Sequence, residues 1–122
     1  MLLDSNSVIY STQPAHGYLR SFILANAPSV SAITVVEVLG YHRLTVKDRK
    51  ELEDFFKNTR VIPIDDRIIS GAVRLRQRRK MALADAIIAA TALEHNLPLV
   101  TRNVNDYKSI SGLRIINPFA TP

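Results

Sequence analysis

The chain has 122 residues, a length that suits one domain with its own core over residues 1–122, and no cysteine, which excludes disulfides, thiolate metal sites and cysteine nucleophiles. No apolar run approaches the about 18 residues that a membrane-spanning helix needs, and the first residues do not resemble a secretory leader, so we expect a cytoplasmic protein without a membrane partner. The net charge of +5, from 16 lysines and arginines against 11 aspartates and glutamates, favours polyanionic partners such as nucleic acid.

The first half of the chain predicts two strands, each followed by helix. The opening "MLLD" is predicted to be a short strand, and residues 14–26 have apolar side chains at helical spacing. The stretch "SVSAI" is expected to be a second strand that leads into a helix over residues 34–43, with Val36 buried. Thr45 has the features of a cap for a further helix over residues 46–58.

The second half repeats this alternation. "RVIPI" is predicted to be a third strand, and Asp66 is expected to cap a helix over residues 67–80. Residues 84–96 form an alanine-rich helix in this prediction, followed by the strands "LPLVT" and "LRIINP". Alternating strands and helices predict an α/β sandwich around a mostly parallel sheet.

Three acidic residues interrupt apolar stretches of the sequence. Asp4 ends the first strand, Glu37 follows the second strand within one helical turn, and Asp85 opens the alanine-rich helix. Because ligands of such sheets bind at the carboxyl ends of the strands, the three carboxylates can face one site. Closely spaced carboxylates need a cation or a proton, and Mg²⁺ or Mn²⁺ suits oxygen ligands. Alternatively, Asp4 caps the following helix and Asp85 complements a helix dipole.

Other polar residues are expected at the same edge of the sheet. Asn103 and Asp106 follow the fourth strand and are alternatives for a fourth position in the site, and Asp106 could equally cap a short helix. We expect three more side chains to position water and phosphate around the acids, namely Ser5, Asn6 and Thr101.

Basic residues concentrate in "RLRQRRK", residues 74–80. Lys80 and Arg102 are expected to contact nucleic-acid phosphates that flank the site. The alternative for the basic run is a solvated helix end, whose cations suit the negative end of the helix dipole.

Four segments together carry a family resemblance: "LLDSN", "SAITVVEVLG", "LADAIIAATALEHNLPLVTRNVNDY" and "INPF". In this order and spacing the sequence resembles a VapC-type PIN-domain toxin, the ribonuclease of a type II toxin–antitoxin system, over nearly its full length. The resemblance implies a PIN-like three-layer α/β/α sandwich with a mostly parallel five-stranded sheet. It also implies an Mg²⁺- or Mn²⁺-dependent endoribonuclease, an RNA substrate, a cognate antitoxin and a homodimer.

Carried over to this sequence, the resemblance assigns metal binding and catalysis to Asp4, Glu37 and Asp85. Ser5 stands where such proteins usually have threonine, and Asn103 stands where many have a fourth acid. The fourth position is therefore open between Asn103 and Asp106.

Cleavage of RNA phosphodiesters is the activity that these residues favour, and two alternatives stay open. One is an RNA-binding module without catalysis, in which the acids are only caps. The other is an aspartyl phosphotransferase or phosphatase with Asp4 as the nucleophile. A familiar signature of that class needs an acid two residues further on, where this chain has Asn6.

Overall fold

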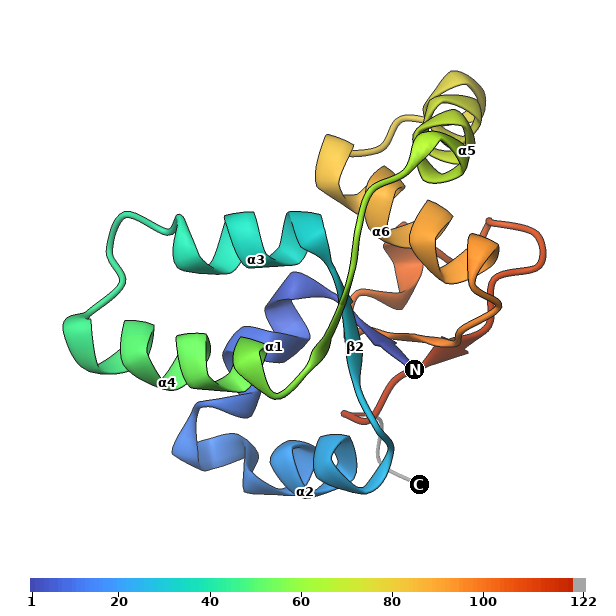
Figure 1. Ribbon diagram of the computed structural model, residues 1–122. Coiled ribbons are helices and arrows are strands. Elements are labelled where there is room, and N and C mark those ends of the chain that lie inside the picture. Colours follow the sequence, from blue (N-terminus) through green and yellow to red (C-terminus); the bar gives the residue numbers. More distant parts are fainter. Residues whose placement is uncertain (120–122) are drawn as a thin grey trace.

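The structure is a computed structural model, and it describes residues 1–119 (Figure 1). The strands are β1 (Leu2–Leu3), β2 (Ser29–Ser31), β3 (Arg60–Ile62), β4 (Leu99–Val100) and β5 (Ile115–Ile116). They form a five-stranded sheet in the order β3-β2-β1-β4-β5, and every pairing is parallel. The predicted parallel sheet is confirmed, although each strand is shorter than predicted.

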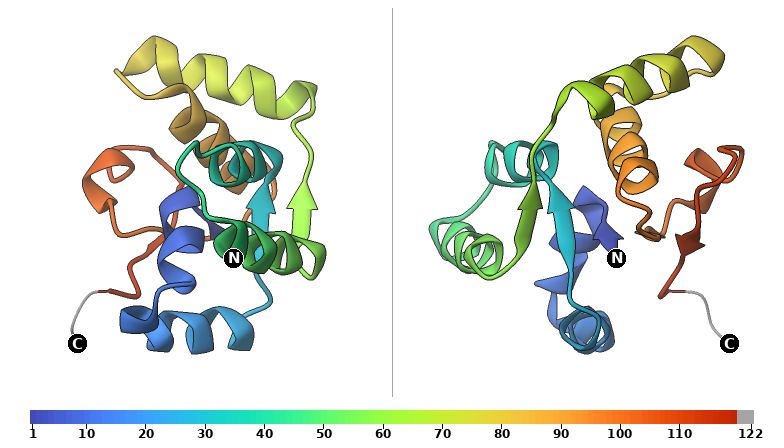
Figure 2. Two further views of the ribbon diagram at one scale, coloured as in Figure 1. Left: turned by 90° about the vertical axis from the view of Figure 1, so that its left-hand side faces the viewer. Right: turned by 45° about the vertical axis from the view of Figure 1, so that its right-hand side comes forward.

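Helices lie on both faces of the sheet (Figures 1 and 2). The helices are α1 (Ser5–Ser11), α2 (Gly17–Ala25), α3 (Ala32–Leu39), α4 (Val46–Lys57), α5 (Asp66–Arg78) and α6 (Leu83–Glu94), with the 3-10 turns η1 (Pro14–His16) and η2 (Val104–Asp106). The sequence predicts no bounds for a helix over residues 5–11, where the structure has α1, although the alternative role of Asp4 as a cap implies a helix that follows it. Within residues 1–119, no helix combines the length and apolar character needed to cross a bilayer.

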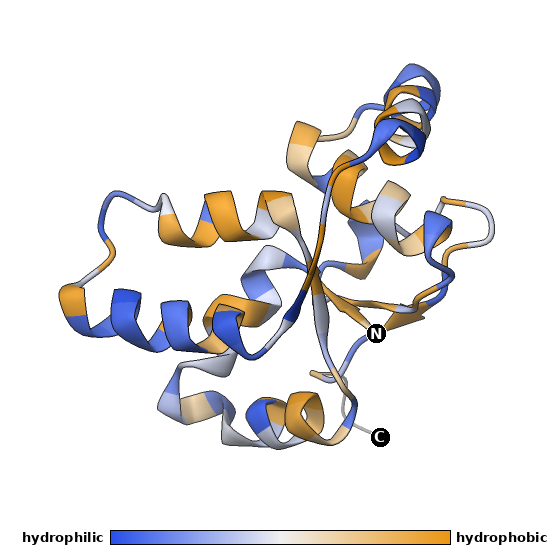
Figure 3. Cartoon of the chain, viewed as in Figure 1, coloured by the Kyte–Doolittle hydropathy of each residue, from blue (hydrophilic) through white to orange (hydrophobic). Residues whose placement is uncertain are grey.

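The core has two parts, one on each face of the sheet. Adjacent residues of a strand point to opposite faces, so Leu2 packs with side chains of α5 and α6, and Leu3 packs with side chains of α1 to α4. The strands β1, β4 and β5 contain only apolar residues, whereas β2 and β3 also contain Ser29, Ser31 and Arg60. Figure 3 shows that polar residues predominate along α4. Apolar strands covered on both faces are typical of parallel sheets. The three-layer α/β/α sandwich is therefore confirmed.

The strand order places β1 at the centre, between β2 and β4. The chain runs from β1 through β2 to β3 on one side, and α5 and α6 then return it to β4 on the other side. In open parallel sheets, ligands bind at the carboxyl ends of the strands where the order reverses. Leu3 pairs with Val100, so the next residues, Asp4 and Thr101, leave the sheet side by side.

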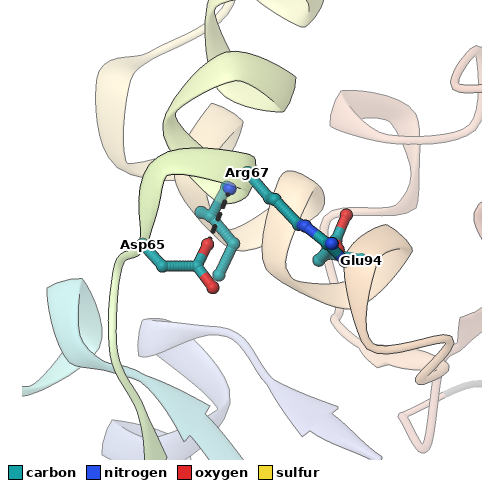
Figure 4. A network of polar contacts seen from close by, with 4 residues as sticks. Asp65, Arg67 and Glu94 are labelled. Carbon is teal, nitrogen blue, oxygen red and sulfur yellow. Dashed lines mark hydrogen bonds and ion pairs between the residues drawn. The ribbon is translucent and has the colours of Figure 1, made fainter.

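The cap of α5 differs from the prediction by one residue. The Asp65 carboxylate accepts a hydrogen bond from the Ile68 N–H at 3.0 Å, while Asp66 lies in the first turn (Figure 4). The predicted cap, Asp66, is therefore wrong, because the chain is still extended at Asp65. Figure 4 also shows the ion pair between Arg67 of α5 and Glu94 of α6, whose atoms are 3.3 Å apart.

Helix α3 begins earlier than predicted, and this changes which valine is buried. Ser31 Oγ accepts a hydrogen bond from the Ile33 N–H at 3.2 Å, so the helix starts at residue 32 instead of 34. Its inner face carries Thr34 and Val38, four residues apart, while Val36 is 65% exposed. The prediction that Val36 is buried is wrong. By contrast, the predicted cap of α4 at Thr45 is confirmed.

Candidate active site

Asp4 is the first residue after β1, and its carboxylate is fixed by two hydrogen bonds. The Ser7 N–H donates to Oδ1 at 2.8 Å, and the Thr101 hydroxyl donates to Oδ2 at 2.6 Å. The side chain is only 4% exposed. Asp4 therefore caps α1 and also lies at the carboxyl edge of the central strand, so its structural role and its predicted place in the site are both compatible with its position.

Thr101 connects Asp4 to the loop that follows β4. Its hydroxyl, which donates to Asp4, also accepts a hydrogen bond from the Asn103 N–H at 3.0 Å. Thr101 is completely buried. It thus holds the Asp4 carboxylate in one orientation and fixes the start of the loop that carries Asn103 and Asp106. Its expected role in positioning water and phosphate stays a prediction.

Glu37 lies in the second turn of α3, because that helix begins at residue 32. The Ser5 hydroxyl donates to Glu37 Oε1 at 2.6 Å and is also 3.1 Å from Thr34 Oγ1. These contacts bring the start of α1 and the inner part of α3 together at the sheet edge. Asn6 is exposed, and no side-chain hydrogen bond within residues 1–119 involves it.

Asp85 lies in the first turn of α6, and Tyr107 donates a hydrogen bond to its Oδ1 at 3.1 Å. Burial raises the pKa of Asp85, and the charges of Asp106, Glu37 and Asp4 raise it further, while the hydrogen bond from Tyr107 opposes this. The pKa of the Tyr107 hydroxyl is also raised, first by burial and then by the charge of Asp85. The other three acids are thus close enough to Asp85 for their charges to act on it.

Sequence reasoning missed Tyr107 as a residue of this site. It lies directly after Asp106 in "VTRNVNDY", and only its large apolar ring, which suits a core position beside the sheet edge, pointed to burial there. The pairing with Asp85 spans 22 residues of sequence and two separate elements, so no local spacing reveals it.

Asp106, rather than Asn103, is the candidate fourth residue that acts on Asp85. Both residues are exposed, and the Asn103 side chain makes no hydrogen bond within residues 1–119. Asp106 ends η2, its charge raises the pKa of Asp85, and the two residues line one small pocket. The assignment of the fourth position stays a prediction that these observations favour for Asp106.

The two predicted phosphate contacts lie in different surroundings. Lys80 is exposed and lines the pocket that contains Asp85 and Asp106. The Arg102 guanidinium lies over the rings of Tyr10 and Phe119, with its central carbon 5.7 Å and 5.3 Å from the ring centroids. Cation–π contacts leave the edge of a guanidinium free for an anion. Lys80 thus shares a pocket with two of the acids, whereas Arg102 is packed against two aromatic rings.

The donor set matches a hard divalent cation in its chemistry, because it consists of carboxylate oxygens. Within residues 1–119, however, no three Asp, Glu, His or Cys side chains are gathered closely enough to hold a metal ion. Asp4 is fixed by two hydrogen bonds, whereas Glu37 and Asp106 are exposed, and Glu37 is held by the single hydrogen bond from Ser5. A cation therefore fits if these two exposed carboxylates turn towards Asp4 and Asp85.

Comparisons with known proteins agree with this fold. The sequence model of the PIN domain family matches residues 1–112. A curated relative, the tRNA(fMet)-specific endonuclease VapC of Salmonella typhimurium, is 27% identical over 124 aligned residues, which cover 93% of this chain and 94% of the relative. Over a shorter stretch, 34% of this chain and 31% of the relative, the chain is 44% identical to ribonuclease VapC1 of Rickettsia felis.

Solved structures lead to the same family. A toxin–antitoxin complex from Klebsiella pneumoniae contains a chain that is 30% identical and has a TM-score of 0.79, with 98% of both chains covered. VapBC2 from Rickettsia felis, bound to a DNA fragment from its promoter, has the same fold at 20% identity, with a TM-score of 0.79 and coverage of 95% and 96%. The chain therefore belongs to the PIN domain family, as a member of the VapC type.

Proposed function

We propose that this protein is an Mg²⁺- or Mn²⁺-dependent endoribonuclease and the toxin of a type II toxin–antitoxin pair. The observation that carries the proposal is the convergence of Asp4, Glu37 and Asp85, from three separate segments, at the carboxyl edge of the sheet, where their charges act on Asp85. The names of the relatives, an endonuclease and a ribonuclease, support the same activity.

The residues of the site divide the work in this proposal. When bound, the divalent ion supplies Lewis acidity, which lowers the pKa of water and neutralises charge on the scissile phosphate. Asp4 provides a fixed oxygen edge, because Ser7 and Thr101 hold its carboxylate. Ser5 orients Glu37, and Tyr107 orients Asp85. The net charge of +5 attracts RNA to the surface.

The alternative in which Asp4 attacks phosphorus is not favoured by its surroundings. A carboxylate nucleophile needs room for a whole phosphate group beside its oxygen, whereas the Asp4 side chain is 4% exposed and both of its oxygens accept hydrogen bonds. A metal ion needs only one of the lone pairs that these hydrogen bonds leave free. The RNA-binding module without catalysis leaves the convergence of the acids without a purpose, since repulsion between them lowers stability.

The test is RNA cleavage by the wild-type protein and by Asp4→Asn, with Mg²⁺ or with EDTA. Asparagine is as good a helix cap as aspartate, so Asp4→Asn keeps the start of α1 while it removes the charge. We expect Asp4→Asn to cleave RNA more than about 100-fold more slowly than the wild type, a larger effect than the loss of a residue that only orients a metal ligand. We expect no cleavage by either protein in EDTA. Asp66→Asn, an exposed helix-turn aspartate, is the control. Cleavage by Asp4→Asn at the wild-type rate would exclude the metal-site assignment.

The proposed partners are a cognate antitoxin and a second copy of the chain. Large apolar side chains of α2 and α4 are candidate anchors for an antitoxin, but Phe56 is buried and belongs to the core. Phe22 and Phe55 are half-buried, and Phe55 lines a groove of about 860 Å³ that also includes Leu24, which is 76% exposed. Co-expression with the neighbouring reading frame, followed by light scattering of the purified protein alone and in complex, tests both partners.

A further inference from the structure

Arg79 follows α5 at the end of the basic run, and one of its nitrogens has no partner. Nη1 of its guanidinium is buried, and it makes no hydrogen bond within residues 1–119. Arginine stays charged in proteins, and burying a charged donor without an acceptor is costly. Buried polar groups are nearly always satisfied in native proteins. Arg79 as a whole is only half-buried, so an acceptor from another molecule can reach the guanidinium through its partly exposed side and compensate for the buried nitrogen.

The side chain lines a pocket of about 250 Å³ beside the candidate active site. The residues that line it are Arg79, Lys80, Met81, Ala82, Asp85, Asn105, Asp106 and Ser109. An ammonium, an amide and a hydroxyl of this set can donate hydrogen bonds to an anion, as can the guanidinium. Because Asp85 and Asp106 belong both to the pocket and to the acidic site, a ligand in the pocket would lie next to the scissile position.

The start of α6 adds positive potential to the same pocket. Ala82 occupies the N-cap position and has no side-chain oxygen, so no cap satisfies the first N–H groups of this 12-residue helix. The positive end of a helix dipole and its free N–H groups favour phosphate oxygens. Ala82 itself lines the pocket, so the helix end and Arg79 face the same space.

We propose that this Arg79 pocket binds a backbone phosphate of RNA next to the phosphate that is cleaved. The inference rests on the proposed ribonuclease function and assigns a positioning role to Arg79. Its planar guanidinium can hold two phosphate oxygens at once, unlike the flexible ammonium of Lys80. The carboxylates of Asp85 and Asp106 repel a free anion, so the pocket favours a phosphate that is held in place by the rest of the RNA strand.

The first test measures binding of a fluorescent single-stranded oligoribonucleotide in EDTA over a series of KCl concentrations. Arg79→Ala is expected to bind about 10- to 100-fold more weakly, since charge-assisted hydrogen bonds are lost. The slope of log K against log salt should fall in magnitude by about 0.7, the value for one phosphate contact on a single strand. Arg78→Ala is the matched control, because Arg78 is exposed and does not line this pocket. An unchanged slope, or equal changes in both variants, would overturn the proposal.

A second test locates the phosphate by replacing one linkage at a time with an uncharged methylphosphonate. In the wild type, one linkage should weaken binding more than the others, and in Arg79→Ala this linkage should have no additional effect, because the contact is already lost. The melting temperature of Arg79→Ala should be unchanged or higher, since the free protein loses no hydrogen bond. Equal linkage profiles in both proteins, or a clearly lower melting temperature, would contradict a positioning role.

These outcomes separate this inference from the proposed function. If the wild type binds the oligonucleotide as described but does not cleave it with Mg²⁺, the ribonuclease proposal is wrong, while phosphate binding in the Arg79 pocket is still supported. If the wild type cleaves RNA and Arg79→Ala keeps the wild-type salt slope, the inference about the Arg79 pocket is wrong while the ribonuclease proposal is supported. If the wild type does not bind the oligonucleotide in EDTA, the inference about the Arg79 pocket is wrong, and cleavage with Mg²⁺ decides the ribonuclease proposal separately.

Discussion

At the scale of single residues, Asp85 and Tyr107 form the most informative pair in the site. The raised pKa of Tyr107 keeps its hydroxyl protonated, so it stays a hydrogen-bond donor to Asp85 Oδ1. Asp85 Oδ2 makes no hydrogen bond within residues 1–119. Tyr107 therefore fixes the side chain through one oxygen and leaves the other one for a ligand.

The raised pKa of Asp85 predicts how stability depends on pH without metal. Between the ordinary aspartate pKa, about 3.9, and the higher value in the fold, the native protein binds more protons than the unfolded chain. The free energy of unfolding therefore falls as pH rises through this window. Asp85→Asn removes this loss, so in EDTA its melting temperature should exceed that of the wild type at pH 7, and the difference should shrink towards pH 4. A constant difference over this range would contradict the raised pKa.

The hydrogen bond from Thr101 to Asp4 gives a second prediction at this scale. Thr101→Val leaves a buried carboxylate oxygen without its donor, which should cost about 1–3 kcal/mol in the free energy of unfolding. RNA cleavage should fall about 10- to 100-fold, because Asp4 loses its orientation. Urea denaturation and a cleavage assay measure the two effects.

Thr91→Val is the matched control for Thr101→Val. Thr91 is also completely buried, but its hydroxyl donates to the Ile87 carbonyl of its own helix at 2.7 Å. That carbonyl already accepts a backbone hydrogen bond within the helix, so loss of the Thr91 hydroxyl should change the free energy of unfolding little. If both variants lose the same stability and the same activity, Thr101 has no special role at Asp4.

At the scale of elements, the pair of α5 and α6 supports the basic side of the site. Helix α5 packs on α6 through Ile68, Ala72 and Leu75, and the Arg67–Glu94 ion pair joins them on the surface. An exposed ion pair contributes little to stability, so the apolar contacts and the helix caps hold α5 in place. The position of Arg79, directly after α5, depends on this packing.

The cap of α5 is open to a direct test. Asp65→Ala should lower the free energy of unfolding by about 0.5–2 kcal/mol, because the Ile68 N–H loses its acceptor. Asp66→Ala should cost less, about 0.3–1 kcal/mol, since Asp66 contributes only its charge near the positive helix end. Urea denaturation of the two variants measures the difference. A larger effect at Asp66 would restore the cap expected from the sequence.

At the scale of the whole molecule, the strand order brings the acids together. With β1 between β2 and β4, the residues after these three strands share one edge of the sheet. The segments that carry Asp4, Glu37 and Asp85 are therefore neighbours in space, although they are far apart in the chain. Binding of a cation across them would link the two faces of the sandwich.

A cation that joins these segments should stabilise the whole fold. At a free Mn²⁺ concentration of about 100 times the Kd, the expected gain is about 2.7 kcal/mol, measured as a rise in melting temperature. Glu37→Gln should reduce this rise, because it removes one carboxylate ligand. Glu53→Gln, which changes an exposed acid of α4, should keep it. A melting temperature that does not depend on Mn²⁺ would argue against a metal site.

The sequence by itself determined the succession of strands and helices and the places where acids follow them. Strands appear as apolar runs and helices as periodic ones, and caps such as Thr45 act over three residues, so these features depend on near neighbours. The position of Asp4 after the first strand could be read for the same reason. The exact capping residue of α5 could not be predicted in this way. Both Asp65 and Asp66 are good caps, and the turn after β3 decides that Asp65 is the one used.

Only the tertiary structure decided the strand order, the buried face of α3 and the partners of the acids. Thr101 donates to Asp4 across 97 residues of sequence, and Tyr107 donates to Asp85 across 22. Val38 rather than Val36 is buried because α3 starts at residue 32 and turns that side towards its neighbours. Such contacts arise from long-range pairing of strands and packing of helices, whose energies depend on the whole fold and not on local sequence.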